Sequence, residues 1–267
     1  MTDQTPAAPL PVLKPGAIPV APGPFTLAID IGGSHVKASV LDRDGTLIAR
    51  EVRVATPRPA TPRAVLQAIA GLVAELPPYD RISAGFPGYI RRGRVATAPN
   101  LGTKAWAGFR LDQGLQKRLK KPARVLNDAD VQGLGAISGH GVEVVLTLGT
   151  GIGSALFHDG ALMPHLELGQ HPIAKGKTYD RYLGNAALKH KGPKRWNHRL
   201  KKAIEIVRTL TNFDTLHLGG GNVRLIDFHL PPHVKRAANI EGITGGVRLW
   251  DPSFDAFFAE PRRRKRR

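Results

Sequence analysis

Two adjacent residues, whose side chains are suited to acid–base catalysis and hydrogen bonding, lie where a predicted strand meets a predicted helix. Asp128 and Asn127 follow the short predicted strand 124–126 and precede a helical pattern. At such a junction a carboxylate can accept a proton from an alcohol while the asparagine amide binds a neighbouring hydroxyl. The same pair also makes a good helix N-cap, so the spacing alone leaves both interpretations open.

Two glycine-rich turns are candidate phosphate sites. Glycine lets backbone N–H groups approach an anion closely, because no Cβ intervenes. Asp30 precedes the first turn inside an apolar strand, where a carboxylate needs a cation or a hydrogen bond from the turn. Neither turn has the Walker or GxGxxG spacing, and glycine hairpins also occur as plain turns. The candidates are Gly32, Gly33 and Ser34, and Gly149, Thr150 and Gly151.

Further polar candidates are few. Glu167 and His171, in LELGQH, could bind hydroxyls of a polar ligand. The ten histidines are scattered and form no evident metal-ligand cluster. The sequence has no cysteine, which excludes a disulfide scaffold, a thiolate nucleophile and a Cys-ligated zinc or iron–sulfur site.

The positive charge is concentrated in two segments. The chain carries a formal charge of +18, and residues 175–202 hold ten Lys and Arg against the single acid Asp180. The run 262–267 is entirely basic. Such a field attracts polyanions: nucleic acid, an anionic membrane surface or inorganic polyphosphate. The alternative to polyanion binding for the first segment is an ordinary solvated helix face. For the second segment the alternatives are a solvated chain end and a run that resembles a nuclear localisation signal.

An internal repeat indicates how these residues are positioned. IDIGGSHVKASVLDRDG (29–45) and LTLGTGIGSALFHDG (146–160) each contain an apolar strand, a glycine turn, a second strand and a closing Asp-Gly. Two such hairpins predict two lobes of like topology that face each other. Between them the sequence predicts a strand over 46–54, helices over 62–76 and 111–119, and a hairpin over 89–98; after the second hairpin it predicts a helix over 195–210 and a strand over 214–218.

Six motifs in order make this sequence resemble the ROK sugar kinases of the actin-like ATPase superfamily, most closely their polyphosphate glucokinase branch. The resemblance covers about 27–250. Its motifs are IDIGGSHVKASVLD, GFPGYIRRGRVATAPNL, LNDADVQGLG, LTLGTGIGSALFHDG, LELG and LHLGGGN. It implies an α/β, ribonuclease H-like fold with a cleft between two lobes. The boundaries we expect are a Pro-rich leader over 1–24, lobes over 25–123 and 124–250, and a loose basic tail over 251–267.

The resemblance also implies roles for single residues. Asp128 is similar to the family's catalytic base, which takes the proton of the sugar 6-hydroxyl. Sugar-binding positions are matched by Asn100, Asn127 and Glu167. The first phosphate motif is matched by Asp30 (near Mg²⁺), Gly32, Gly33 and Lys37, the second by Gly149, Thr150, Gly151 and Gly153. A nucleotide-binding turn is matched by Gly219, Gly220 and Gly221.

The sequence departs from the family pattern at one point of the sugar site. The family's E-x-G-H reads Glu167-Leu168-Gly169-Gln170 here, with His171 one residue late. Gln170 can still hydrogen-bond a hydroxyl, but the change leaves the choice of sugar open. The absence of the cysteine-rich zinc motif of most ROK proteins favours the polyphosphate glucokinase branch.

The resemblance implies a homodimeric sugar kinase, and the sequence, in which no apolar run approaches the ~20 residues of a membrane span, predicts a cytoplasmic protein. Glucose is the expected acceptor, and polyphosphate, ATP or both are the expected donors. The expected polyphosphate track is Lys191, Lys194, Arg195 and Lys202. Two alternatives remain: an ATP-only ROK hexokinase of other sugar specificity, and a catalytically weak sugar- or polyanion-binding protein whose basic tail contacts nucleic acid.

Overall fold

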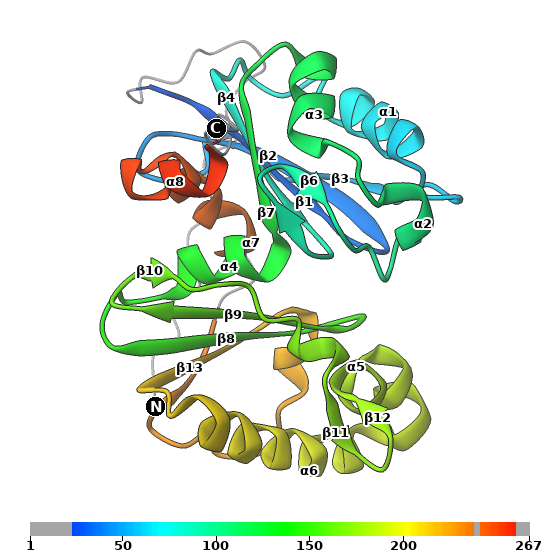
Figure 1. Cartoon of the computed structure of the whole chain (residues 1–267), viewed down its shortest axis with the longest axis vertical. Coiled ribbons are helices and arrows are strands. Elements are labelled where there is room, and N and C mark those ends of the chain that lie inside the picture. The colour runs from blue at the N-terminus through cyan, green and yellow to red at the C-terminus, as the bar shows by residue number, and fades with distance from the viewer. Residues whose placement is uncertain (1–22, 238–240, 260–267) are drawn as a thin grey trace, which may run out of the picture.

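Two α/β lobes stacked one above the other make up the molecule (Figure 1). The computed structural model describes residues 23–237 and 241–259, so the leader up to residue 22 and the basic run 262–267 lie outside the described residues. Among the described residues, no helix is long and apolar enough to span a bilayer.

The first lobe is built on a five-stranded sheet in the order β3-β2-β1-β4-β7. Its strands are β1 (Thr26–Ile31), β2 (His35–Leu41), β3 (Val52–Ala55), β4 (Arg81–Phe86) and β7 (Ala123–Asn127). One face is covered by α1 (Pro62–Leu72), α2 (Thr103–Trp106) and α3 (Leu111–Leu119) (Figure 1). A small hairpin, β5 (Ile90–Arg91) and β6 (Arg94–Val95), projects from it. The predicted hairpin and the predicted helix 111–119 are both present.

The second lobe repeats this topology, with the sheet order β10-β9-β8-β13-β14. Its strands are β8 (Val142–Leu148), β9 (Ile152–His158), β10 (Ala161–Leu162), β13 (Thr215–Gly219) and β14 (Val234–Arg236). In each lobe the first strand pairs antiparallel with the second and parallel with a later strand. The predicted repeat therefore corresponds to two sheets of equivalent connectivity.

Long helix α6 (Asn185–Thr211) covers the face of the second sheet that points away from the first lobe (Figure 1). It starts ten residues earlier than the predicted helix 195–210, because two helical segments join across Gly192, whose φ is 75°. Pro193 then starts the second segment, a position where its missing N–H costs no hydrogen bond. The short α5 (Tyr179–Leu183) precedes α6, and a two-stranded sheet of β11 (Pro172–Ala174) and β12 (Lys177–Thr178) lies beside it.

Helix α4 (Asp128–Ala136) lies between the two sheets and contacts both of them (Figure 1). A third hydrophobic cluster forms there, in which Val131 and Leu134 of α4 pack with Phe157 of β9 and Leu249. The start of α4 is therefore fixed by both lobes. This is the place to which the sequence assigned Asp128.

The structure corrects three expectations about organisation. The boundary at residue 124 falls inside β7, which pairs with β4 in the first sheet because its register continues the parallel order. The predicted strand 46–54 is mostly irregular, and only β3 at its end is extended, beyond an isolated bridge at Leu47. Arg199, counted in the basic segment, is buried: it donates to the Tyr182 carbonyl at 3.0 Å and its guanidinium lies over that ring.

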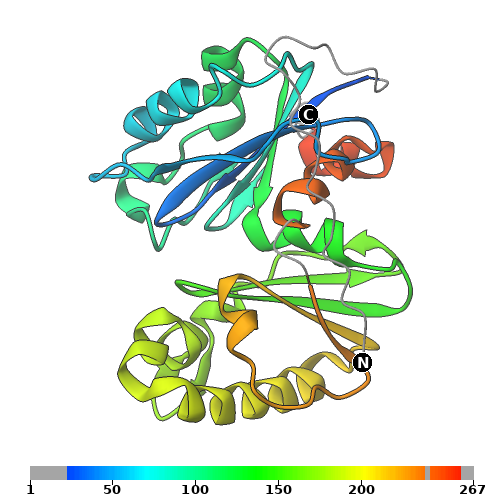
Figure 2. The same cartoon turned by 180° about the vertical axis from the view of Figure 1, so that it is seen from behind.

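The segment from Asp251 to Phe258 is not a loose tail. The chain returns to the first lobe through α7 (Glu241–Thr244), η3 (Gly245–Trp250), η4 (Pro252–Phe254) and α8 (Asp255–Phe258), as Figure 2 shows from behind. The Trp250 ring lies beneath the guanidinium groups of Arg81 and Arg124, and Phe254 is buried. These contacts order the segment because they shield aromatic area from water.

Candidate active site

A cleft between the lobes brings together most of the predicted site residues. The predicted residues that line it are Asp30, Gly32, Gly33, Lys37, Asn100, Asn127, Asp128, Gly149, Thr150, Gly151, Gly153, Glu167, Gln170, Gly220 and Gly221. They come from both sheets, from the start of α4 and from η1 (Leu168–Gln170). Gathering them in one concave surface is what a two-substrate site requires.

Asp128 is the first residue of α4, and Asn127 caps the helix. The Asn127 Oδ1 accepts the N–H groups of Ala129 at 2.8 Å and Asp130 at 3.4 Å, while its Nδ2 donates to the Gly88 carbonyl at 3.2 Å. The N-cap interpretation is confirmed for Asn127, and both side chains line the cleft, where their roles as proton acceptor and hydroxyl ligand stay predictions. The cap fixes where the Asp128 carboxylate stands.

The Asp128 carboxylate is unusually basic. Burial, followed by the negative charge of Asp30, raises the pKa of Asp128 to about 8, against a hydrogen bond from the Ala129 N–H that favours the charged form. A carboxylate with a pKa near neutrality is a far better proton acceptor than an ordinary one. The environment thus suits Asp128 to general-base chemistry.

Asp30 lies near the end of β1, directly opposite Lys37 of β2. Burial raises the pKa of Asp30 to about 6, although the Lys37 charge opposes this. Within the described residues, no group of three or more His, Asp or Glu side chains could hold a metal ion by itself. Mg²⁺ in kinases needs no such cage, because it binds one or two carboxylates together with substrate phosphates. Asp30, beside Asp128, fits that donor set.

The first glycine turn contacts the predicted sugar site directly. A Cβ on Gly33 would lie only 3.2 Å from the Cβ of Asn100, so the absence of a side chain lets the turn approach Asn100. The Gly32 N–H donates to the His35 carbonyl at 2.9 Å, which closes the turn. Ser34, a predicted phosphate donor, is exposed and does not line the cleft.

The second glycine turn is tied down by a residue that the sequence did not single out. Asp180 of α5 accepts the Ile152 N–H at 2.6 Å through Oδ1 and the Gln170 amide at 2.8 Å through Oδ2. A Cβ on Gly151 would lie 2.9 Å from the same Oδ1. Only the fold reveals this role, because Asp180 lies 28 residues from Ile152 in an otherwise basic segment.

Gln170 and His171 are oriented differently from the prediction. Gln170 lines the cleft but donates to Asp180, and His171 is exposed outside the cleft. Glu167 instead accepts a hydrogen bond at 2.8 Å from His165, a residue that the sequence gave no reason to select. The imidazole that contacts Glu167 therefore belongs to His165, two residues before it, and not to His171.

The three glycines at the end of β13 border the cleft with two of their number. Gly220 and Gly221 line it, whereas Gly219 is buried behind them against the Gln132 amide. Gly220 has a φ of 83°, and a Cβ there would lie 2.6 Å from the Leu148 carbonyl oxygen. Glycine is therefore required at this point of the turn.

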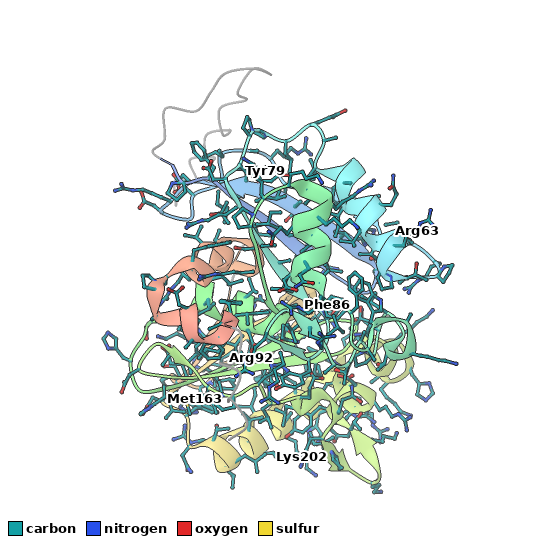
Figure 3. The ribbon with its side chains drawn as sticks, turned by 45° about the horizontal axis from the view of Figure 1, so that its top comes forward. Arg63, Tyr79, Phe86, Arg92, Met163 and Lys202 are labelled. Carbon is teal, nitrogen blue, oxygen red and sulfur yellow. The ribbon has the colours of Figure 1, made fainter. Side chains whose placement is uncertain are left out.

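The four predicted polyphosphate residues all lie on α6, outside the cleft lining. Lys194, Arg195 and Lys202 are exposed and Lys191 is half-buried. Figure 3 shows Lys202 at the lower edge of the second lobe, away from Phe86 near the centre of the molecule. The helix itself begins at the cleft, since the Asn185 N–H donates to the Gly149 carbonyl at 3.0 Å.

The family model and the known proteins that match this chain agree with one another. Residues 26–170 match the sequence model of the ROK family. The chain is 34% identical over 235 residues to a polyphosphate glucokinase of Mycobacterium leprae, covering 82% of this chain and 72% of that protein. It is 32% identical over 237 residues to the polyphosphate glucokinase of Mycobacterium tuberculosis strain H37Rv, covering 82% and 88%.

Solved structures agree with the sequence relatives. An inorganic polyphosphate/ATP-glucomannokinase from Arthrobacter sp. strain KM superposes with a TM-score of 0.77 at 33% identity, covering 84% of this chain and 97% of that one. A ROK family glucokinase from Streptomyces griseus, solved with glucose and AMPPNP, gives a TM-score of 0.71 at 19% identity, covering 84% and 98%. At 19% identity, the likeness to the Streptomyces griseus protein shows a shared fold only.

Proposed function

Because the chain belongs to the ROK family, we propose that it is a kinase that transfers a phosphoryl group from polyphosphate, ATP or both to the 6-hydroxyl of glucose. The names of the relatives and of the glucomannokinase support the acceptor and the donors. One observation of this chain carries the proposal: a half-buried carboxylate of raised pKa, Asp128, lies in a cleft that two glycine turns border.

The proposed reaction is a displacement at the terminal phosphorus. The Asp128 carboxylate takes the proton of the 6-hydroxyl, the 6-oxygen bonds to phosphorus, and the bond to the leaving phosphate oxygen breaks. The catalytic contribution is positioning and charge neutralisation rather than covalent chemistry. Asn100, Asn127 and Glu167 are the proposed partners of the other sugar hydroxyls.

The phosphate groups are proposed to lie between the two glycine turns. Backbone N–H groups of Gly33, Thr150 and Gly151 would face them, with Lys37 adding positive charge, while the N–H groups of Gly32 and Gly149 close the turns on the His35 and Gly151 carbonyls. The fixed donors of the turns cost little reorganisation when charge develops. The kinase relatives imply a divalent cation, and we propose Mg²⁺ with Asp30 as a ligand. When bound, Mg²⁺ would neutralise charge on the transferring phosphoryl group.

The basic surface of α6 is proposed to bind the distal part of polyphosphate. The helix starts at the second glycine turn, and its exposed Lys and Arg side chains follow outward from it. A polyanion that leaves the cleft beside Gly149 would meet this charge, whereas ATP would place its adenosine near Gly220 and Gly221. A homodimer and a cytoplasmic location, which the resemblance implies, stay predictions.

The direct test is formation of glucose 6-phosphate by the full chain with Mg²⁺, in parallel assays with long-chain polyphosphate and with ATP. The kinase proposal predicts turnover with at least one of the two donors, and the proposed role of α6 predicts turnover with polyphosphate. Turnover with ATP alone would contradict the polyphosphate role of α6. No product with either donor, for glucose, mannose, fructose and amino sugars alike, would contradict the kinase itself and favour a binding protein.

A further inference from the structure

A buried histidine connects the proposed sugar site to the interior of the molecule. His165 lies in the loop between β10 and η1, and its ring stands between two carboxylates. Its Nδ1 lies 3.2 Å from both oxygens of Asp130, and its Nε2 lies 2.8 Å from Oε1 of Glu167. The order of the row is therefore Asp130, His165, Glu167, from the interior towards the cleft.

Burial decreases along this row in the same direction. The side chains of Asp130 and His165 are only 5% and 7% exposed, whereas that of Glu167 is 33% exposed and lines the cleft. The Tyr89 ring stacks on the imidazole with a centroid distance of 5.5 Å and an interplanar angle of 14°. The imidazole is thus held by hydrogen bonds in its plane and by an aromatic ring over its face.

The charges around His165 favour the imidazolium form. Burial alone would lower the pKa of His165, but the hydrogen bonds and charges of Asp130 and Glu167 outweigh it and raise the pKa to about 10. Asp128 on the same helix as Asp130 adds a further acid to the cleft, as do Asp30 from β1 and Asp180 from α5. An imidazolium donates from both nitrogens, which is what two flanking carboxylates require.

We propose that His165 is a positioning residue for the sugar: anchored by Asp130, it holds the Glu167 side chain so that one oxygen is directed to the cleft. The proposal rests on the proposed function. Because Oε1 already accepts from the imidazole, Oε2 is the oxygen that receives a sugar hydroxyl. Gln170 cannot replace His165 in this arrangement, since its amide is directed to Asp180.

The proposal separates sugar affinity from phosphoryl transfer. His165 acts through Glu167 and does not touch the reacting oxygen, so its loss weakens glucose binding more than turnover at saturating glucose. A hydrogen bond to a charged partner contributes about 1.5–3 kcal/mol, which corresponds to roughly 10- to 150-fold in affinity.

The test is a double-mutant cycle on glucose binding, measured by calorimetry on the full chain without donor. We compare wild type, His165→Gln, Glu167→Gln and the double variant, with melting temperature and donor turnover recorded for each. We expect His165→Gln to weaken binding about 10-fold or more, while kcat changes less than about threefold. In the Glu167→Gln background the same change should alter the affinity less than about twofold. His158→Gln, an exposed histidine beside Asp159, is the matched control and should leave binding unchanged.

Two other outcomes of the cycle overturn the proposal. Unchanged affinity in His165→Gln, or an effect equally large in the Glu167→Gln background, would show that His165 does not act through Glu167. If His165→Gln does not fold, Asp130→Asn decides, because it keeps the imidazole but removes its anchor: weaker glucose binding supports the proposal and unchanged binding refutes it. If wild type itself binds no glucose, the proposed function fails and this inference fails with it.

Discussion

The environment of Asp128 in the cleft disfavours the charged form of its side chain. Its half-buried carboxylate lies near that of Asp30, and among the described residues it accepts a hydrogen bond from the uncharged Ala129 N–H but from no cation. Sites arranged for catalysis commonly keep such unfavourable charge, at the expense of stability. The residue that gives the cleft its proposed chemistry should therefore also destabilise the fold.

This leads to a prediction for Asp128→Asn at different pH. An acid with a raised folded-state pKa adds stability below its unfolded value, near 3.8, and loses that stability as pH rises through about 8. Asparagine carries no charge, so the melting temperature of Asp128→Asn should exceed that of wild type, and by more at pH 8.5 than at pH 5. We expect a difference of roughly 3 °C or more at pH 8.5, since ~1 kcal/mol shifts a chain of this size by about 2–4 °C.

Thermal unfolding at the two pH values measures this difference. Asp44→Asn is the control, because Asp44 is largely exposed, and its difference from wild type should not grow with pH. A variant Asp128→Asn that is less stable than wild type at pH 8.5 would show that the carboxylate is well compensated in the folded chain.

At the scale of elements, glycine turns and loops determine where the polar side chains lie. The loop after β4 is an example: Gly88 accepts from the Asn127 amide, and a Cβ on Gly88 would lie only 2.1 Å from the Thr97 carbonyl oxygen. That oxygen belongs to the backbone and cannot rotate away. The loop and the cap of α4 are thus packed as one unit.

Gly88→Ala should consequently reduce both stability and sugar binding. Forcing a methyl group against the Thr97 carbonyl costs ~2 kcal/mol, which lowers the melting temperature by roughly 4–8 °C. It should also weaken glucose binding, because Asn127 moves with Gly88. Gly71→Ala in α1 is the matched control: a Cβ there meets nothing within 4 Å, so melting temperature and affinity should stay the same or rise slightly. Equal behaviour of the two variants would refute this account of the loop.

How far the sequence predicts these elements depends on whether the signal is local. The two glycine turns, the helix 111–119 and the junction at Asp128 were predictable, because strand periodicity, turn residues and N-caps are encoded within a few residues. His165 and Asp180 were not, since their partners Asp130 and Ile152 lie 35 and 28 residues away and no local pattern marks such pairs. The packing of Trp250 on Arg81 and Arg124 likewise depends on the tertiary fold.

At the scale of the whole molecule, the two repeated lobes meet at α4, and the C-terminal segment connects them from behind (Figure 2). The Gly246 carbonyl accepts from Ser83 of β4, and Arg248 donates to the Leu134 carbonyl at the other end of α4. The cleft opens between the lobes, and the charge of α6 lies on the outer side of one of them. The basic side chains of α6, outside the cleft, should therefore contribute to the binding of polyphosphate.

The charge of α6 predicts a difference between donors. Changing Lys191, Lys194, Arg195 and Lys202 to Gln should raise the apparent KM for long-chain polyphosphate about 10-fold or more at low salt, while the KM for ATP changes less than about twofold. Steady-state kinetics with both donors measures this, and added salt should reduce the difference between variant and wild type. The control is a variant with Arg43, Arg63, Lys117 and Arg118 changed to Gln, exposed cations on the first lobe. Equal effects on both donors would contradict the proposed track.

The most direct test of the account is phosphoryl transfer by Asp128→Asn, measured beside glucose binding by the same protein. We predict that kcat falls by about 10²–10⁴, the contribution of a positioned general base, while the dissociation constant of glucose stays within about threefold of wild type. Turnover at the wild-type rate would show that Asp128 is not the base. Loss of glucose binding together with turnover would make Asp128 a sugar ligand and contradict the proposed division of roles in the cleft.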